Sequence, residues 1–329
     1  ATGSLKLSQI VSTVTSKGDD DTITTGDGNK HIVGGYGADA ITAGAGSHIV
    51  MGDNGQIDYD TDGVVKTLAT TDTDDHPEYG DDDTIDVGAG DNHIFGGMGS
   101  DTIDATTGTG VILGDNGEVR YAGATGSLKL SQIVSTVTSK GGDDIITTGD
   151  GNKHIVGGYG EDDITAGVGD HMVMGDNGQM DYDAAGTVKV LTTTDTVDHP
   201  EYGGDDTILL TGDGNNHILG GMGSDTITNS ATTSGTTDVI LGDNGVVTYA
   251  ADASGVLKLH RIVSTVLSQG IENDNTITGN DIITTGDGDK HIVGGYGQDS
   301  ITAGAGDHIV MGDNGQVDYD TDGAVKTIV

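Results

Sequence analysis

The stretches GGYGADAIT at residues 34–42 and GGMGSDTID at 96–104 establish the period of this chain. In both, a glycine-rich turn is followed by one acidic residue and then by one bulky apolar residue. Apolar or aromatic residues return at intervals of nine, first at Ile23, Ile32, Ile41, Val50 and Tyr59. This spacing does not fit helix periodicity and is too long for one strand. It suits a turn plus a short strand with one inward side chain, so that two nonapeptides complete one coil of a flattened parallel solenoid.

The nonapeptides are grouped into larger repeats. LKLSQIVSTV at 5–14 returns at 128–137 and, with two changes, at 257–266, which gives a period of about 123 residues. GDNG begins at 52, 114, 175, 242 and 312 and divides that period into modules of roughly 62 residues. We therefore expect a partial hairpin of a preceding module at 1–17, modules at 18–80, 81–141, 142–203 and 204–280, the last with insertions, and a truncated module at 281–329.

A different pattern follows each GDNG. Gln56-Ile-Asp-Tyr, a Thr-Asp-Gly turn and Val64-Val-Lys-Thr-Leu alternate in polarity as the two strands of a hairpin do. We interpret 72–83 as a surface connection and 270–280 as an irregular insertion. The predicted fold is all-β, with parallel β-roll or β-solenoid modules of nonapeptide repeats interspersed with β-hairpins.

The composition excludes several classes of function. The 53 Asp and Glu residues against 13 Lys and Arg give a net charge of −40, which excludes nucleic acid as a natural partner because phosphate binding needs clustered cations. The chain has no Cys for disulfides or thiolate sites, no apolar run long enough for a membrane span, and no visible signal peptide. A glycine-rich acidic composition is typical of disorder, yet only five of the acids are Glu. The preference for Asp indicates turns and calcium sites instead.

Five segments resemble the G-G-x-G-x-D-x-U-x nonapeptide of the RTX, or haemolysin-type calcium-binding, family: GGYGADAIT, GGMGSDTID, GGYGEDDIT, GGMGSDTIT and GGYGQDSIT. The hairpins and the longer repeat are not part of that motif. The resemblance implies a parallel β-roll, calcium held between successive turns, and secretion. It does not imply a toxin, since the same module serves proteases, lipases, adhesins and surface-layer proteins.

The sixth position of the nonapeptide is where a calcium ligand is expected. In the first and third turns of every module it is Asp: Asp21, Asp39, Asp83, Asp101, Asp144, Asp162, Asp206, Asp225, Asp281 and Asp299. In the second and fourth turns it is Lys30, His48, Asn92, Gly110, Lys153, His171, Asn216, Asp238, Lys290 and His308. Because alternate nonapeptides lie on opposite edges of a roll, we expect one edge to bind calcium and the other mostly not to.

Backbone carbonyls and a second set of acids complete the predicted sites. By the family pattern, carbonyl ligands come from the first and third residues of each third turn, namely Gly34, Tyr36, Gly96, Met98, Gly157, Tyr159, Gly220, Met222, Gly294 and Tyr296. The GDNG turns carry an acid at their second position, and we interpret these acids as closing the last site of each module: Asp53, Asp115, Asp176, Asp243 and Asp313. A tight turn with an Asx hydrogen bond is the alternative, and both can hold. With two sites per module the chain would bind about ten calcium ions, and we expect it to stay expanded until they bind.

The histidines, the catalytic motifs and the threonines bear on other possible functions. His31, His93, His154, His217 and His291 each precede an inward apolar residue and should point outward, as an exposed polar row rather than a transition-metal ladder. No protease, hydrolase or phosphate-loop motif occurs, so we expect no enzyme, and the strictly periodic carboxylates favour metal ligation over a glycosidase pair.

Outward threonines such as Thr22 and Thr24 form rows of the kind found on ice-binding solenoids. These rows are interrupted, and each module offers only about two coils on that side.

We therefore predict a secreted, extracellular or cell-surface calcium-binding repeat protein that acts as a calcium-stiffened structural or adhesive element, such as a surface-layer, matrix or filament component. A calcium-dependent folding or secretion module of a larger RTX enzyme or toxin is the alternative, and an ice-binding β-solenoid is the second. The expected partners are calcium ions and neighbouring repeats, and unpaired sheet edges would permit end-to-end self-assembly into fibres.

Overall fold

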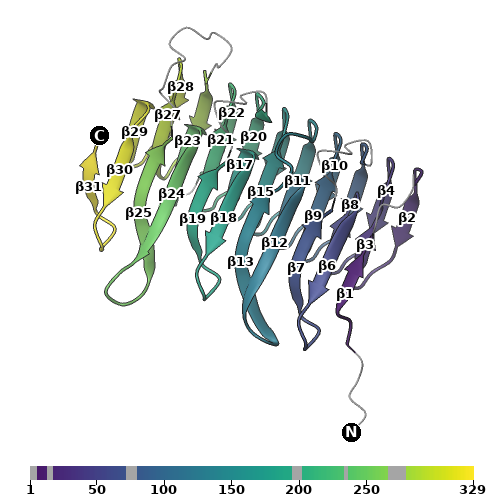
Figure 1. Cartoon of the computed structure of the whole chain (residues 1–329). Helices are drawn as coiled ribbons and strands as arrows, with labels where there is room; N and C mark the ends of the chain where they lie inside the picture. The colour runs from purple at the N-terminus through teal and green to yellow at the C-terminus, as the bar shows by residue number, and fades with distance from the viewer. Residues whose placement is uncertain (1–5, 13–17, 72–79, 195–201, 233–235, 266–278) are drawn as a thin grey trace.

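A computed structural model of the chain describes residues 6–12, 18–71, 80–194, 202–232, 236–265 and 279–329. These residues form three long sheets (Figure 1). Among them no helix is long and apolar enough to cross a membrane. Most of the predicted connection at 72–83, most of the insertion at 270–280, and His76 and His199 lie outside the described residues.

Two of the sheets are parallel and together make the roll. The first, here called the outer sheet, contains β2 Thr22–Thr25, β4 Ala40–Ala43, β8 Thr84–Val87, β10 Thr102–Ala105, β14 Ile145–Thr148, β16 Asp163–Ala166, β20 Thr207–Leu210, β22 Thr226–Asn229, β26 Ile282–Thr285 and β28 Ser300–Thr302. The second, the middle sheet, contains β3 His31–Val33, β5 Ile49–Met51, β9 Asn92–Gly97, β11 Gly110–Asp115, β15 Lys153–Gly158, β17 Met172–Asp176, β21 His217–Gly221, β23 Thr237–Asp243, β27 Asp289–Gly295 and β29 His308–Asp313.

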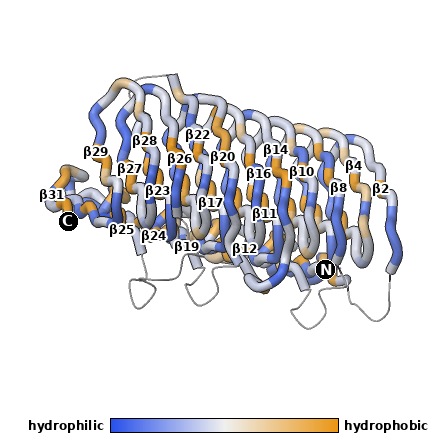
Figure 2. Tube along the Cα trace, turned by 90° about the horizontal axis from the view of Figure 1, so that it is seen from above, coloured by the Kyte–Doolittle hydropathy of each residue, from blue (hydrophilic) through white to orange (hydrophobic). Residues whose placement is uncertain are grey.

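The register confirms that two nonapeptides complete one coil. Ile23 of β2 lies beside Ile41 of β4, and Ile32 of β3 lies beside Val50 of β5, in each case two periods of nine later. Neither sheet is interrupted at a module boundary, because β4 pairs with β8 and β5 with β9 in the same register. The five modules therefore stack their coils into one continuous roll (Figure 2).

The hairpins form a third layer that the repeat pattern did not predict. Their strands join into one antiparallel sheet, the hairpin sheet, made of β1 Gln9–Val11, β6 Gly55–Tyr59, β7 Val65–Thr70, β12 Gly117–Ala124, β13 Ser127–Ser135, β18 Gly178–Tyr182, β19 Val188–Thr193, β24 Gly245–Ala251, β25 Leu257–Ser264, β30 Gln316–Tyr319 and β31 Val325–Ile328. Hairpins of adjacent modules are hydrogen-bonded to each other, as where β7 pairs with β12.

Short acidic turns close most of these hairpins. Asp60 Oδ1 accepts hydrogen bonds from the amides of Asp62 and Val64 at 2.8 and 2.9 Å, and Gly63 adopts a positive φ of 79°. An Asp side chain that accepts amides two and four residues ahead fixes a tight turn, and the glycine supplies its left-handed residue.

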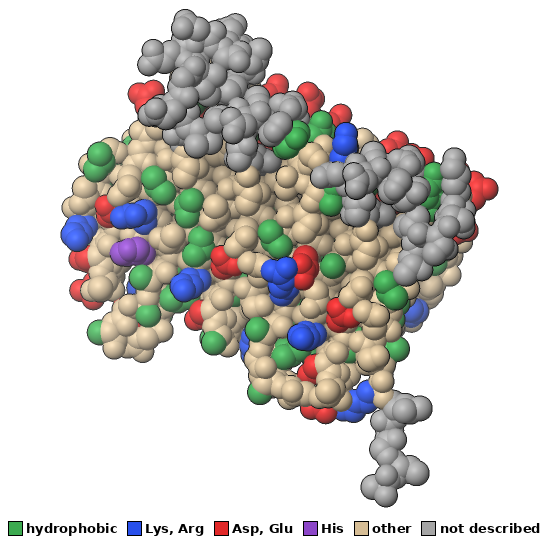
Figure 3. Space-filling view, in the orientation of Figure 1, with side chains coloured by type: hydrophobic (Ala, Val, Ile, Leu, Met, Phe, Trp, Pro, Cys, Tyr) green, Lys and Arg blue, Asp and Glu red, His purple; other side chains and the backbone are tan. Residues whose placement is uncertain are grey.

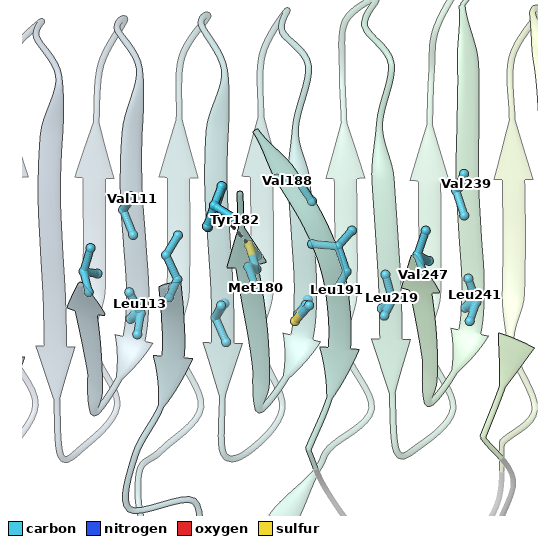
Figure 4. Close-up of a cluster of buried hydrophobic side chains, with 14 of the residues drawn as sticks. Val111, Leu113, Met180, Tyr182, Val188, Leu191, Leu219, Val239, Leu241 and Val247 are labelled. Atoms are coloured by element: carbon cyan, nitrogen blue, oxygen red, sulfur yellow. Dashed lines mark hydrogen bonds between the residues drawn. The ribbon is translucent and has the colours of Figure 1, made fainter. Parts of the chain in front are cut away.

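Two apolar cores result from the three layers. The predicted stack of Ile and Val fills the space between the outer and middle sheets, where Ile85, Ile103 and Ile164 are fully buried. A second core lies between the middle and hairpin sheets, where Leu113 and Leu241 meet Val119, Met180 and Val247 (Figure 4). The middle sheet is thus covered on both faces: in β11, for example, Ile112 faces the first core while Val111 and Leu113 face the second.

The histidines before the inward apolar residues are therefore not an outward row, and that prediction was wrong. They face the hairpin sheet, and each is hydrogen-bonded to a tyrosine hydroxyl in the pairs His31–Tyr59, His93–Tyr121, His154–Tyr182, His217–Tyr249 and His291–Tyr319. Burial lowers the pKa of His93, His154 and His217 to about 4, which keeps these rings neutral at physiological pH. The pairs join the hairpin layer to the roll.

Replacing Tyr182 by Phe should destabilise the folded chain by about 1–2 kcal/mol, because the ring is retained while the bond to His154 Nδ1, 3.0 Å long, is lost. Urea unfolding in saturating calcium measures this difference. Tyr59→Phe is the matched control, since His31 is exposed and water can replace the hydroxyl there. Equal losses at the two positions would show that burial of the pair is unimportant.

Candidate metal sites along one edge

The ten position-six aspartates form a single column along one edge of the roll. They lie in the turns that lead into the outer sheet, and we call this side the aspartate edge. From Asp39 onward, the Oδ1 atom of each aspartate accepts a hydrogen bond from the backbone amide of the aspartate one coil before it, over nine successive bonds of 2.7–3.1 Å from Asp21 to Asp299. The ladder crosses every module boundary without a gap.

In eight of the ladder aspartates the second carboxylate oxygen has no such donor. Oδ2 is buried and without a hydrogen-bond partner in Asp39, Asp83, Asp101, Asp144, Asp162, Asp225, Asp281 and Asp299. Buried polar atoms are normally satisfied, and a buried carboxylate requires a counter-charge. These atoms therefore indicate that a cation belongs beside each of them.

A row of glycines provides the space for that cation. A Cβ added at Gly96 would overlap Asp101 Oδ2 and the carbonyl oxygen of Gly114, so only glycine leaves room where these two oxygens converge. The same overlap of one carboxylate and one carbonyl oxygen recurs at the other glycines of the row: Gly34, Gly52, Gly114, Gly157, Gly175, Gly220, Gly242 and Gly294.

Four of the ten predicted carbonyl donors take part in this arrangement. The structure places the carbonyls of Gly96, Gly157, Gly220 and Gly294 beside the carboxylates of Asp83, Asp144, Asp206 and Asp281. A further set of carbonyls was not predicted. These carbonyls belong to the first GDNG glycine and lie beside Asp39, Asp101, Asp162, Asp225 and Asp299: Gly52, Gly114, Gly175, Gly242 and Gly312. Their spacing from the predicted glycines, 18 residues in four modules and 22 residues between Gly220 and Gly242, was the available signal.

The third residue of each turn has a different contact. The amides of Met98, Tyr159, Met222 and Tyr296 donate to the GDNG aspartate one coil earlier. The carbonyls of Tyr36 and Tyr296 lie close to Gly18 and Gly279. The group that contacts an aspartate in these four residues is the backbone amide and not the carbonyl. A calcium ligand at this carbonyl therefore stays a prediction.

The GDNG aspartates lie next to the ladder and bind the coil that follows. Asp115 Oδ1 accepts from the amide of Gly142 at 3.3 Å while Oδ2 accepts from Tyr159, and Asp176 makes the same contacts with Gly204 and Met222. Asp53 and Asp176 are fully buried, whereas Asp313, in the final described coil, is exposed. These acids connect successive modules through amide contacts, and their role as calcium ligands stays a prediction.

Burial and mutual repulsion disfavour the charged form of the whole column. Desolvation raises the pKa of Asp101 well above its ordinary value, and the neighbouring Asp144 and Asp83 raise it further. The same causes raise the pKa of Asp83 to about 8, and desolvation raises that of Asp281 to about 7. A cation bound among these oxygens would reverse this shift, because it favours the ionised carboxylates.

The donor set fits calcium. All the convergent atoms are hard oxygens from carboxylates and carbonyls, which calcium takes in sets of about six to eight. Within the described ranges no three His, Asp or Glu side chains form a ready cluster, so backbone carbonyls must complete any ligand set. The aspartates of adjacent coils and the glycine carbonyls between them are the residues that would hold the ions.

Replacing Asp101 by Asn should raise the calcium concentration needed for half-maximal folding by roughly tenfold or more, because it removes one buried anion from the middle of the column. Calorimetric titration should also show about one to two fewer ions bound. Asp104→Asn, at an exposed carboxylate in the strand that follows Asp101, is the control. Equal effects of the two substitutions would exclude a specific site at Asp101.

Without calcium, the folded chain should become more stable as the pH falls from 8.5 to 6.5. The folded-state pKa of Asp83, about 8, lies above the unfolded value of 3.8, so protonation favours the folded state until the pH rises through about 8. Each carboxyl that titrates in this range contributes about 1.4 kcal/mol per pH unit. Histidines that are buried and neutral in the fold, such as His93 and His154, oppose this trend only as the pH approaches 6.5, where the unfolded imidazole becomes protonated. The strand signal in circular dichroism, recorded in a chelator across this pH range, measures the shift toward the folded chain, and a flat profile would contradict the raised pKa values.

Comparison with known families agrees with this geometry. The family model described as RTX calcium-binding nonapeptide repeat (4 copies) matches residues 15–47, 79–112, 138–170, 202–231 and 291–316. Searches of curated proteins and of solved structures each found no match. The matched stretches contain the glycine-rich turns and nine of the ten ladder aspartates. The chain contains RTX calcium-binding nonapeptide repeats in five stretches between residues 15 and 316.

Proposed function

We propose that this calcium-binding repeat protein is a secreted structural or adhesive element of a cell surface, matrix or filament, stiffened by calcium. The observation that supports the proposal most strongly is the unbroken aspartate ladder. It runs through all five modules in one register, so every bound ion would join adjacent coils of the same rod. The proposed role is mechanical and non-catalytic.

Continuity of all three sheets supports the same proposal. Each module adds two strands to the outer sheet and two to the middle sheet, and its hairpin pairs with the hairpins on either side. There is no hinge at the module boundaries within the described residues, because the strand pairing continues from β10 to β14 and from β16 to β20. A roll held in this way by hydrogen bonds and ions resists bending along its whole described length.

The distribution of charge separates two faces of the rod. Seven of the 13 Lys and Arg residues lie in strands of the hairpin sheet, namely Lys66, Arg120, Lys129, Lys189, Lys258, Arg261 and Lys326 (Figure 3). Several are paired with acids, as Arg261 Nε is with Asp318 Oδ1 at 2.7 Å. The hairpin face is therefore the least acidic surface, and it is the one we propose for contact with a neighbouring molecule or surface.

A calcium-dependent folding or secretion module of a larger RTX protein is the alternative, since the same ladder would serve it. Ice binding is the second alternative, and one observation favours it. The outward threonines lie on a single ten-stranded outer sheet rather than on separate short patches. Asp86, Asp104, Asp163 and Leu209 still interrupt these rows, and thermal hysteresis is the measurement that separates this function from a structural one.

Adding calcium to the chelated chain should produce the strand signal in circular dichroism and, in electron microscopy, rods or fibres. The physical reason is that the ladder carboxylates repel one another at a spacing of about 4.8 Å until cations neutralise them. An unchanged strand signal in chelator would contradict calcium-dependent folding. Single compact particles in calcium, despite a full strand signal, would contradict the filament role and leave the folding module as the function.

A further inference from the structure

The edge opposite the aspartates has the same turns with the reverse chemistry. These turns lead into the middle sheet, and we call this side the opposite edge. At their sixth position they carry side chains with N–H donors in eight of ten cases, the exceptions being Gly110 and Asp238. The aspartate edge presents carboxylate oxygens, which are hydrogen-bond acceptors. The opposite edge presents N–H groups of Lys, His and Asn side chains, which are donors.

Lys153 is the most complete example. Its ammonium group donates to four backbone carbonyl oxygens, those of Gly108, Gly149, Asp150 and Gly151, the last three at 3.3, 3.1 and 3.2 Å. The side chain is only 2% exposed. Burial lowers the pKa of Lys153, and the carboxylates of Asp150 and Asp91 counteract that shift. Four carbonyl oxygens around one buried positive charge form a cation site occupied by a side chain.

The other two lysines of the row are bound in the same way. Lys290 is fully buried and donates to the carbonyl of Asp287 at 2.7 Å, and its Nζ lies 2.8 Å from Asp238 Oδ2. Lys30, in the first described coil, donates to the carbonyls of Asp27 and Gly28 at 2.7 and 2.6 Å. Both lysines therefore bind carbonyls of their own turn.

Histidine and asparagine bind the equivalent carbonyl when lysine is absent. Nε2 of His48, His171 and His308 lies 2.8–3.1 Å from the carbonyl four residues earlier, and Asn92 donates to Gly88 in the same pattern. Lys153 makes this contact too, with Gly149. A turn carbonyl that a metal ion could bind is therefore already bound to a side-chain nitrogen.

The lysines also use a gap in the preceding module. Lys153 reaches the carbonyl of Gly108 in a turn whose sixth residue is Gly110, so no side chain blocks it. Lys290 pairs with Asp238, which is the sixth residue of the equivalent turn in the module before Lys290. Each of these lysines thus bridges two modules, as an ion would.

We propose that the opposite edge contains carbonyl-lined sites for a primary ammonium ion, filled in cis by Lys30, Lys153 and Lys290, and that removing Lys153 leaves a site that takes a small alkylammonium ion from solution. The contacts of Nζ determine the class of ligand. Several carbonyl oxygens accept hydrogen bonds there, so the ligand must have N–H donors and one positive charge. This assignment does not depend on calcium at the aspartate edge, so it can stand if the proposed function fails.

The test is chemical rescue of Lys153→Ala, folded in calcium with and without propylammonium chloride. The variant should unfold at a temperature about 5 °C or more below the unsubstituted chain, because four buried carbonyls lose their donor. Propylammonium should restore most of that loss, whereas tetramethylammonium, which has the charge but no N–H, should not. Lys140→Ala removes an exposed lysine and is the control for net charge.

Two results would overturn the proposal: equal shifts for Lys153→Ala and Lys140→Ala, or equal effects of the two ammonium ions on Lys153→Ala. If Lys153→Ala does not fold in either salt, the same comparison is made with Lys30→Ala, whose ammonium binds two turn carbonyls in a less buried position. Absence of propylammonium rescue there as well would also reject the site.

Discussion

The rest of the structure depends on a column of buried carboxylates that cannot all be charged unless cations lie between them. Each ladder aspartate from Asp39 to Asp299 uses one oxygen to bind the backbone of the preceding coil, and its other oxygen points toward a glycine. The first oxygen fixes the register of the roll, and the second creates the requirement for a cation. Structural order and metal binding therefore involve the same side chain, which explains why metal binding and folding are coupled in such a site.

The opposite edge shows a second solution to the same problem. A solenoid turn exposes several carbonyls to the interior of a narrow coil, and they must find donors or a cation. On one edge the chain supplies carboxylates, and a cation from solution would supply the positive charge. On the other it supplies ammonium, imidazole or amide N–H groups, so Lys153 and His171 make the turn complete without a metal. Only half of the turns then depend on external ions.

Much of this could be predicted from the sequence because a period of nine is a local signal. The spacing of Ile23, Ile32 and Ile41 predicted the coil, and the residues at position six predicted two edges of different chemistry.

The hairpin sheet could not be predicted in this way. Pairing of β7 with β12 joins residues of different modules, and alternation looks the same for a strand that is exposed and one that is packed on another sheet. For that reason His154 was expected at the surface, although the 28-residue spacing to Tyr182 was present. The GDNG glycine carbonyls were not predicted because these turns have no Asp at their sixth position, although their backbone follows the same path as the other turns.

Continuous strand register across module boundaries has a consequence for how such a chain can change length. A unit removed or duplicated leaves a junction with the same pairing as every other junction, and each module changes the rod by about 10 Å, the height of two strands in a sheet. The exchangeable unit is nevertheless the pair of modules. Lys153 requires the empty position of Gly110 behind it, and Lys290 requires Asp238, whereas His48 or His171 would fill that space. Unequal recombination between repeats should thus be tolerated in steps of about 123 residues and penalised in steps of half that length.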